Sequence, residues 1–452
     1  MTIPDTRPAP SAAFRSWFAG QAANNRQDVR RVPLSELAGW AFEPGTGNLA
    51  HRSGRFFTVE GLRVCTDHGG NRQWVQPIIV QPERGLLGIL VKRFDGVPHY
   101  LLQAKVEPGN VNGLQLSPTV QATRSNYDRV HGGRPTRYLE FFTGARRGQV
   151  LADVLQSEQG SWFLHKRNRN MVVETTSDVA VGEDFFWFTL RQIRDLLLRD
   201  NLINMDARSV LACLPPALGM PEHGDGEFRE AVRASLAGEP AESATRELLS
   251  WLTDIRARTA LLQDRVPLSS ADTDGWRCDG DRVFRPDGRY FEVIGVDVRA
   301  ANREVGAWQQ PLLAPSGVGL IGLAAKRVHG SVQVLVQARP EAGSLAVAEL
   351  APTVQCRPAN YADEDQPKPM FLGEFEALGP ARIRYDTVQS EEGGRFYHAQ
   401  NRYVVAEVDE DFPAATSAYH RWVTLRQLTD LLVHGNYLNV ELRTLLACVQ
   451  SL

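Results

Sequence analysis

The chain has 452 residues, of which 43% are apolar and 23% are charged, a composition typical of a soluble globular protein. This length accommodates two or three ordinary domains. Because 50 Lys and Arg residues oppose 53 Asp and Glu residues, the formal net charge is only −3, and the overall field favours neither nucleic acid nor an anionic membrane as a partner.

Strands are predicted early in the chain, where β-branched and aromatic residues are dense. A hairpin turn is predicted at Asp95 and Gly96. The predicted strands are 55–64, 77–81, 88–91 and 100–104.

Pairs of short amphipathic helices are predicted further along, because Leu, Ile and Val recur there at helical spacing. They lie at 189–198, 206–214, 424–433 and 441–449. Cys213 and Cys448 occupy the same place in the second helix of each pair. We interpret both cysteines as buried core residues rather than reactive thiols.

The chain also repeats itself at a nearly constant spacing, which indicates an internal duplication. The repeat predicts a first domain at 1–219 with an N-terminal helical lead, a linker and helix at 220–250, and a second domain at 251–452. Matching residues include Trp17 and Trp251, Trp74 and Trp308, Glu107 and Glu341, Gly109 and Gly343, Asn126 and Asn360, Ser157 and Ser390, and Trp187 and Trp422.

No apolar run approaches the roughly 18 residues that cross a membrane, and the first residues lack the pattern of a signal peptide. We therefore expect a cytoplasmic protein without a membrane partner. The five cysteines are widely separated and form no C-x-x-C pair, which argues against a disulfide framework or a structural zinc site.

Several common enzyme motifs are absent from the sequence. There is no dinucleotide-binding G-x-G-x-x-G between strand and helix, no phosphate-binding G-x-x-x-x-G-K-[ST], no H-E-x-x-H and no G-x-S-x-G. These absences exclude the usual nucleotide-cofactor enzymes, zinc proteases and nucleophile-elbow hydrolases.

Four segments resemble the sugar-nucleotide 2,3-dehydratases, and the likeness spans nearly the whole chain. They are 121–133 (QATRSNYDRVHGG), 156–170 (QSEQGSWFLHKRNRN), 351–361 (APTVQCRPANY) and 389–403 (QSEEGGRFYHAQNRY). Members of that family act on dTDP-4-keto-6-deoxyglucose in deoxysugar biosynthesis for natural products such as antibiotics.

The resemblance implies an α+β fold of two tandem Nudix-like domains, with mixed β-sheets flanked by helices. It also implies a homodimer, a dTDP-linked 4-keto-6-deoxy sugar as substrate, and a nucleotide-sugar pocket in each half, of which one turns over.

The sequence departs from a true Nudix hydrolase where that family holds its metal. No carboxylate occurs between Asn110 and Asn126, so a hard cation such as Mg²⁺ would have too few oxygen ligands from this segment. We therefore expect no metal and no cofactor, and we expect the nucleotide to be retained as a handle.

Dehydration of a 4-keto sugar requires a base near C3, a hydrogen-bond donor to the C4 oxygen and an acid for the departing C2 hydroxyl. The candidates for these roles are Lys105, Tyr127, His131 and Glu140. Lys105 is notable because its counterpart is Arg339, and only lysine gives up its proton readily when its pKa is depressed.

Substrate binding is predicted at paired positions of the two repeats. Glycine in the loops 157–160 and 390–393 lets the backbone approach a ligand, arginine suits a diphosphate, and tryptophan can stack on thymine. The alternative to ligand binding is a plain turn for each loop, a solvated surface position for each arginine and a core position for each tryptophan. The predicted binding residues are Trp74, Arg124, Asn126, Arg129, Ser157, Glu158, Gln159, Gly160, Asn168, Arg169, Trp308, Asn360, Ser390, Glu391, Glu392, Gly393 and Arg402.

The repeats differ in charge around the matching Asn-Tyr pair. The first repeat carries Arg124, Arg129 and Arg134, whereas the second has the acidic run 363–365. We therefore expect catalysis in the first repeat. Two other functions stay open: a Nudix-like hydrolase of nucleotide sugars, and a non-catalytic nucleotide-sugar binding protein.

Overall fold

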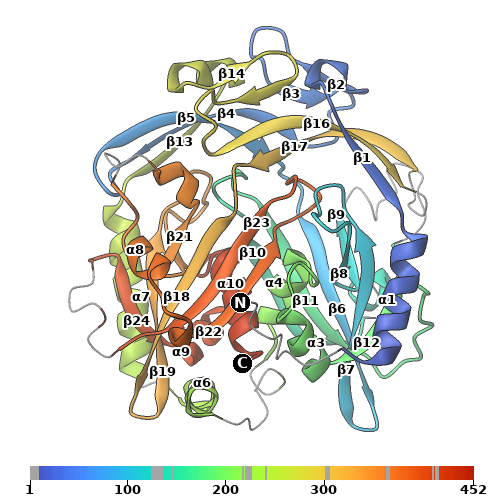
Figure 1. The fold of residues 1–452 in the computed structure, drawn as a ribbon, viewed down its shortest axis with the longest axis vertical. Helices are drawn as coiled ribbons and strands as arrows, with labels where there is room; N and C mark the ends of the chain where they lie inside the picture. Colours follow the sequence, from blue (N-terminus) through green and yellow to red (C-terminus); the bar gives the residue numbers. More distant parts are fainter. Residues whose placement is uncertain are drawn as a thin grey trace.

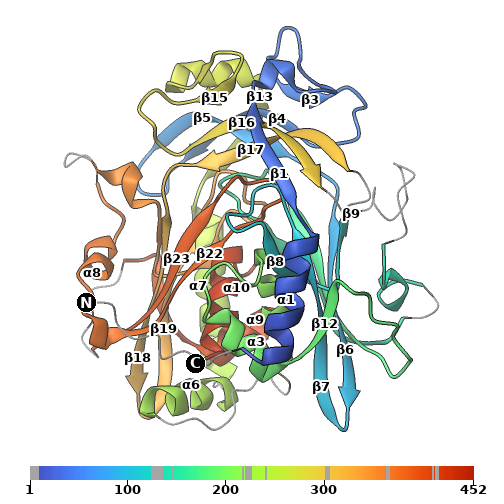
Figure 2. The ribbon, with the colours of Figure 1, turned by 45° about the vertical axis from the view of Figure 1, so that its right-hand side comes forward.

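The computed structural model describes residues 10–123, 136–144, 147–215, 218, 226–239, 242–300, 306–362, 367–409, 412 and 417–452. The two repeats lie side by side, each with a large sheet, and two smaller sheets arch over one end of the pair (Figure 1). Helices from both repeats lie between the two large sheets (Figure 2).

The two large sheets are equivalent, strand by strand. The strands of the first are β6 Gly85–Phe94, β7 Val97–Val106, β8 Leu114–Ser117, β9 Val120–Thr123, β10 Gln149–Ser157, β11 Arg167–Glu174 and β12 Phe185–Thr189. Those of the second are β18 Gly319–Val328, β19 Ser331–Arg339, β20 Glu349–Ala351, β21 Val354–Cys356, β22 Ile383–Ser390, β23 Gln400–Glu407 and β24 His420–Thr424.

Both large sheets are mixed. The first has the order β10-β11-β6-β7-β12, with β9 beside β6 and β8 beside β7, and the second repeats these pairings with β22, β23, β18, β19, β24, β21 and β20. β11 runs parallel to β6 and β23 parallel to β18, whereas the other described pairs are antiparallel. The predicted α+β class with mixed sheets is confirmed.

The two smaller sheets are built by exchange of strands between the repeats. Their strands are β1 Gln27–Val32, β2 Trp40–Phe42, β3 Leu49–His51, β4 Thr58–Thr66, β5 Arg72–Val80, β13 Leu261–Val266, β14 Arg277–Cys278, β15 Arg282–Phe284, β16 Phe291–Ala300 and β17 Ala307–Pro315. β1 of the first repeat pairs with β16 of the second, and β13 of the second pairs with β4 of the first.

Glycine permits the close approach of each exchanged strand. A Cβ atom at Gly295 would lie 2.5 Å from the carbonyl oxygen of Val32, and one at Gly61 would lie 2.5 Å from that of Pro267. A side chain at either position would push the exchanged strand away. The repeat pattern did not predict this strand exchange.

The helices follow the duplication too. They are α1 Ala12–Asn24, α3 Leu190–Leu197, α4 Met205–Ala212, α6 Glu227–Ala237, α7 Glu242–Arg258, α8 Leu372–Glu376, α9 Leu425–Leu431 and α10 Val440–Val449, with 3-10 turns at Leu34–Glu36, Leu139–Phe141, Leu268–Asp274, Pro358–Tyr361 and Pro380–Arg382. Thr189 and Gln192 form a capping box at α3, and Thr424 and Gln427 form the same box at α9. Equal local sequence therefore gives equal helix starts.

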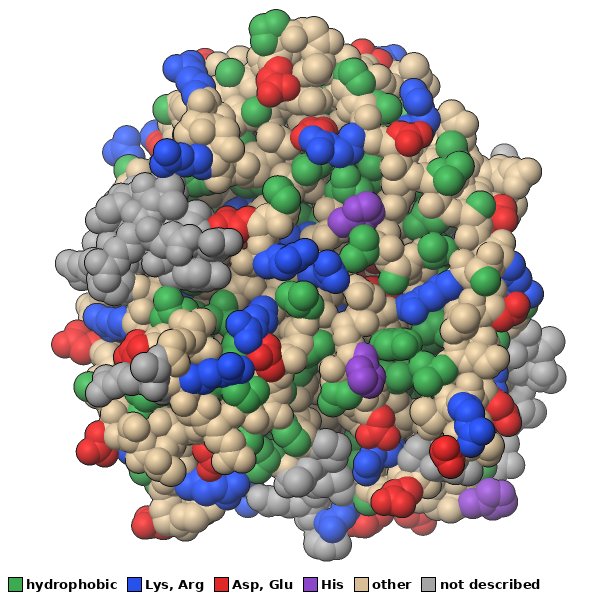
Figure 3. Space-filling model, turned by 180° about the vertical axis from the view of Figure 1, so that it is seen from behind, with side chains coloured by type: hydrophobic (Ala, Val, Ile, Leu, Met, Phe, Trp, Pro, Cys, Tyr) green, Lys and Arg blue, Asp and Glu red, His purple; other side chains and the backbone are tan. Residues whose placement is uncertain are grey.

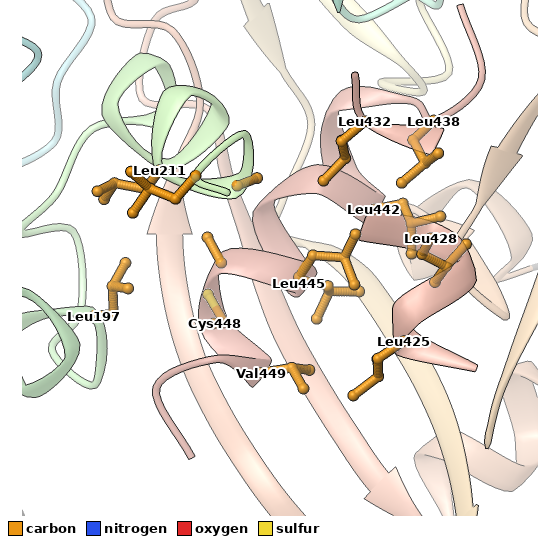
Figure 4. Packing of buried hydrophobic residues seen from close by; sticks show 14 of the residues in the cluster. Leu197, Leu211, Leu425, Leu428, Leu432, Leu438, Leu442, Leu445, Cys448 and Val449 are labelled. Atoms are coloured by element: carbon orange, nitrogen blue, oxygen red, sulfur yellow. The ribbon is translucent and has the colours of Figure 1, made fainter. Parts of the chain in front are cut away.

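α4 and α10 pack against each other at the centre of the molecule. Their apolar side chains, among them Leu211, Leu445 and Cys448, belong to one core that spans both repeats (Figure 4). Within this core, Arg208 on α4 and Arg443 on α10 are fully buried. Because a buried guanidinium must find acceptors, their partners fix the surrounding backbone.

Each of these arginines donates to the backbone of the opposite repeat. Arg443 donates to the carbonyl oxygen of Ser157 at 2.5 Å, and Arg208 donates to that of Ser390 at 2.6 Å. Both serines end a strand, β10 or β22, just before a loop. The helix of one repeat thus anchors a loop of the other.

Each of these two loops, which follow Ser157 and Ser390, contacts a glycine of the other repeat. The amide of Gly109 donates to the carbonyl oxygen of Gly393 at 2.7 Å, and that of Gly343 donates to Gly160 at 2.6 Å. A Cβ atom at Gly343 would lie 2.0 Å from the carbonyl oxygen of Phe163. The crossing therefore requires glycine for space.

Most local predictions are confirmed, although boundaries differ. The predicted strands fall within or overlap β4 to β7, and the predicted helix pairs are α3 with α4 and α9 with α10. Asp95 and Gly96 have φ of 49° and 81°, as a tight hairpin turn requires. Cys213 and Cys448 are buried, as expected.

The surface matches the near-neutral composition. Basic and acidic side chains are interspersed over the face seen in Figure 3, with hydrophobic side chains between them. Among the described residues, no helix is both long and apolar enough to cross a membrane.

Replacing Gly343 by alanine is expected to lower the free energy of unfolding by about 1–3 kcal/mol, the usual cost of overpacking. Gly20→Ala in α1 is the matched control, because a Cβ there meets nothing within 4 Å. Alanine should stabilise that helix by roughly 0.5–1 kcal/mol. Denaturant unfolding measures both variants, and equal stabilities would contradict the tight crossing.

Candidate functional site

Two clusters of polar side chains lie where the crossing loops meet the large sheets, and each contains residues of both repeats. The first cluster consists of Lys105, Glu107, Glu158, Lys166, Asp206, Glu392 and Arg395. The second cluster consists of Gln159, Arg339, Glu341, Glu391 and Glu441, at positions equivalent to members of the first cluster, together with Tyr403.

The clusters share a common framework at the end of β7 and β19. Lys105 Nζ lies 3.5 Å from Glu107 Oε1, and Gln121 on β9 donates to the same oxygen at 2.8 Å. In the second cluster Arg339 Nε lies 3.5 Å from Glu341 Oε1. A glutamine on β21, equivalent to Gln121, donates to that oxygen at 3.1 Å.

Glu158, in the loop after β10, is a buried carboxylate with an unused oxygen. Asn168 Nδ2 donates to Oε1 at 2.8 Å, whereas the buried Oε2 has no hydrogen-bond partner among the described residues. Burial, and then the nearby carboxylate of Glu392, raise the pKa of Glu158 to about 7. Near neutral pH this group can therefore both accept and release a proton.

Glu391, the counterpart of Glu158, has every oxygen occupied. Its Oε1 accepts from Asn401 Nδ2 and from the Tyr403 hydroxyl, both at 2.7 Å. Its Oε2 accepts from Gln159 Nε2, also at 2.7 Å. Three donors hold this carboxylate, which suits a structural role.

Three further charges occur in the first cluster alone. Burial lowers the pKa of the Lys166 ammonium, which donates to the carbonyl oxygen of Glu83. Burial likewise raises the pKa of Glu392 and lowers that of Arg395. The aligned residues of the other repeat are uncharged: Ala399, Gln159 and Trp162.

Glu392 and Arg395 reach the first cluster from the second repeat. Arg395 Nε donates to Gln81 Oε1 at 3.1 Å and its guanidinium stacks over the ring of Phe57, both in the first repeat. Buried Asp206 on α4 lies near Glu392 and Glu158, and burial followed by these two charges raises its pKa well above the usual value. The first cluster is thus a joint product of both repeats.

The structure brings together some of the predicted site residues. Lys105, Glu158 and Glu392 meet in the first cluster, and Gln159 and Glu391 in the second. The neighbouring Gly160, Gly393, Ser157 and Ser390 form the crossing loops, with Ser157 Oγ donating to Glu349 and Ser390 Oγ to Gln115. Asn168 supports Glu158 directly.

Other predicted residues lie apart from the clusters. Arg169 makes a bidentate pair with Asp153 at 2.7 and 2.6 Å, and Arg402 makes the same pair with Asp386 at 2.8 and 2.6 Å. Glu140 is exposed on a 3-10 turn.

The two tryptophans and Asn360 also have defined positions. Trp74 and Trp308 are half-buried on β5 and β17, and each indole nitrogen donates to a glutamine two residues on, at 2.8 and 2.9 Å. Asn360 Oδ1 accepts from the amide of Tyr290 at 2.9 Å. Stacking of either tryptophan on a base stays a prediction.

Five predicted residues lie outside the described residues: Arg124, Asn126, Tyr127, Arg129 and His131. The acidic run 363–365 does so as well, and the charge comparison between these two segments therefore stays a prediction.

Sequence reasoning missed four members of the first cluster: Glu107, Lys166, Asp206 and Arg395. Lys166 and Arg395 left a signal, because each is charged where the matched position of the other repeat is not. Glu107 and Asp206 left none, since each has a carboxylate counterpart, Glu341 or Glu441.

No group of three or more His, Cys, Asp or Glu side chains is placed to hold a metal ion in the described part of the chain. An open depression of about 680 Å³ does occur elsewhere, beside α6. Its arginines are paired with its acids, Arg327 with Glu227 and Glu407, and Arg382 with Asp409. These paired charges leave the first cluster as the stronger site for chemistry.

Comparison with known proteins identifies the family. The model of the NDP-hexose 2,3-dehydratase family matches residues 11–214 and again 245–449. A protein of Streptomyces violaceoruber is 49% identical over 456 aligned positions, covering 100% of this chain and 98% of the relative. One of Saccharopolyspora spinosa is 49% identical over 449 positions, covering 98% and 92%.

A third relative, from Amycolatopsis orientalis, is 46% identical over 443 positions, covering 97% of this chain and 89% of its own. All three are named dTDP-4-dehydro-6-deoxy-alpha-D-glucopyranose 2,3-dehydratase. With a family match in each repeat and relatives of almost equal length, the chain belongs to the NDP-hexose 2,3-dehydratase family.

Proposed function

We propose that this chain removes water across C2 and C3 of dTDP-4-keto-6-deoxyglucose and yields the 3,4-diketo-2,6-dideoxy sugar nucleotide. The observation that carries the proposal is the first cluster, where a buried carboxylate with a pKa of about 7 lies among ammonium and guanidinium groups. The relatives support the proposal, because they align with this chain over nearly their whole length and are named for this reaction.

The reaction needs only proton transfer. A base removes the C3 hydrogen, which the neighbouring C4 ketone acidifies, and leaves an enolate. The enolate electrons re-form the C4 carbonyl and a C2–C3 double bond as the C2 hydroxyl leaves with a proton, as water. The resulting enol becomes the 3-ketone by taking a proton at C2 and releasing the proton of its C3 hydroxyl, so atoms and electrons balance without a redox partner.

The first cluster is the better candidate for the active centre. It holds two lysines and an arginine that can stabilise an enolate or a leaving group, whereas the second cluster uses its glutamine and tyrosine to hold Glu391 in place. Lys105 is only 20% exposed and lies at the edge of the first cluster, where it can donate to the C4 oxygen. Tyr127 and His131 remain candidates for the same catalytic work.

The residues that bind the nucleotide stay predictions. Trp74 and Trp308 remain candidates for stacking on thymine, and Arg124 and Arg129 for the diphosphate. Arg169 and Arg402 are weaker candidates, because each already holds an aspartate. A remote nucleotide contact would help to position the sugar ring.

Finer features of the family belong to this proposal as well. We infer two domains, 1–219 and 251–452, joined by the segment 220–250, with Nudix-like folds that have lost the metal-binding carboxylates. We further infer a cytoplasmic homodimer that serves deoxysugar biosynthesis for natural products. The repeated mixed sheets support the domain assignment.

Turnover should not require a divalent metal. Incubation of the protein with dTDP-4-keto-6-deoxyglucose and excess chelator is expected to give a product lighter by one water, detected by mass spectrometry. Metal-dependent release of a sugar phosphate would instead support a nucleotide-sugar hydrolase. Tight binding with unchanged ligand would support a non-catalytic binding protein.

Charge removal at one matched position should separate the clusters. Lys105→Met is expected to lower kcat by about 10²–10⁴-fold, the usual contribution of a proton-transferring or donating group. Arg339→Met, its counterpart, removes the same charge from the second cluster and should cost less than about tenfold. Steady-state kinetics measure both variants, and equal losses would overturn the assignment of the active cluster.

A further inference from the structure

Two matched glutamates of the repeats are held in opposite ways. Resting on the proposed function, we propose that Glu158 is the catalytic base that takes the C3 proton, and that Glu392, delivered by the second repeat, tunes it for that role. Glu391, which aligns with Glu158, has a structural role instead.

Hydrogen bonding separates the two glutamates. Glu391 accepts three bonds, and its two oxygens are both occupied. Glu158 accepts one bond from Asn168, and its Oε2 is left without a partner although the residue is only 4% exposed. A buried oxygen without a donor is costly and needs an explanation, and a catalytic role is one such explanation.

Single substitutions between the repeats account for this difference. The hydroxyl that reaches Glu391 belongs to Tyr403, and the aligned Asn170 of the first repeat does not donate to Glu158. The amide that reaches Glu391 belongs to Gln159, and the aligned residue is Glu392. One donor is missing and the other is replaced by a carboxylate.

The charged groups that face Glu158 come from four elements. Glu392 lies on the loop after β22, Lys166 just before β11, Asp206 on α4 and Arg443 on α10. Burial and Glu392 raise the pKa of Glu158 to about 7, while Arg443 and Lys166 act in the opposite direction. A base works best when its pKa lies near the working pH.

One carboxylate can serve both halves of the elimination. Glu158 Oε2 takes the C3 proton, and the C–H electron pair forms the enolate. When the C2–O bond breaks, the carboxylic acid returns that proton to the departing hydroxide, which leaves as water. The carboxylate is regenerated, and the enol then takes a proton at C2 from solvent or from the ammonium of Lys166. Its C3 hydroxyl releases a proton to solvent or to the same lysine, which leaves the C3 ketone and restores the ammonium.

Glu158→Gln tests the base directly. The variant should lose about 10²–10⁴-fold in kcat while still binding dTDP, as measured by calorimetry. In the wild-type protein kcat/KM should rise with pH through about 7, because the base acts as the carboxylate. This limb should be absent from the residual activity of the variant.

Glu392→Gln tests the tuning residue. Removing the like charge should lower the pKa of Glu158, so the rising limb of kcat/KM should move to lower pH by roughly one unit. A merely structural role for Glu392 would reduce activity without moving the limb.

Glu349→Gln is the matched control. Burial raises the pKa of Glu349 to about 7 as well, and its carboxylate accepts from Ser157 Oγ at 2.7 Å. The aligned residue of the first repeat is Gln115, which accepts the same bond from Ser390. Glutamine is therefore tolerated at this position, and the control should keep activity and pH profile.

The outcomes separate the inference from the proposed function. If the wild-type protein dehydrates the substrate and Glu158→Gln keeps its rate or its pH limb, the inference is wrong and the proposed function stands. If the wild-type protein does not dehydrate the substrate, the proposed function is wrong. Loss of both dTDP binding and turnover in Glu158→Gln would also contradict the inference, since a base is not required for binding.

Discussion

The structure depends on two buried arginines that must find acceptors. Arg443 and Arg208 are fully buried between the repeats, and each donates, besides a bond within its own repeat, to a backbone carbonyl group of the opposite half. Those carbonyl groups belong to the residues that precede Glu158 and Glu391. Because an unpaired guanidinium in this core would cost several kcal/mol, the loops have little freedom to move. The energetic demand of the core therefore sets the geometry of both polar clusters.

Duplication gives two equal scaffolds, and a few side chains make them chemically different. The framework is the same in both: a basic residue beside a glutamate at the end of a strand, a glutamine that supports it, and a second carboxyl group on the central helix. In the second cluster a tyrosine and a glutamine satisfy the loop carboxylate. In the first cluster asparagine and glutamate stand at those positions, so Glu158 Oε2 is left without a hydrogen-bond donor. A change of two side chains on a fixed backbone thus converts a structural group into a reactive one.

The fold was largely predictable because its determinants are local. Strand composition, the Asp95-Gly96 turn and the threonine and glutamine capping boxes each act within a few residues, and the matched spacing gave the duplication. The site was predictable only in part, because its determinants are long-range. Nothing near Glu392 in the sequence shows that it meets Glu158. Strand exchange and the crossing at Gly109 and Gly343 bring these residues together, and both depend on space that only the assembled backbone reveals.

This arrangement explains how a duplicated protein can depend on a half that lacks its own reactive carboxylate. Glu392 and Arg395 lie on the same loop of the second repeat as Glu391, whose carboxylate oxygens are both hydrogen-bonded. They nevertheless complete the first cluster. Loss of the second repeat would therefore remove the charges of Glu392 and Arg395 from the first cluster. It would also remove Arg443, which anchors the loop of Glu158, and the exchanged strand β13. The first cluster therefore needs the second repeat, whether or not the second repeat binds a ligand of its own. Selection on one reactive centre is then sufficient to preserve both copies.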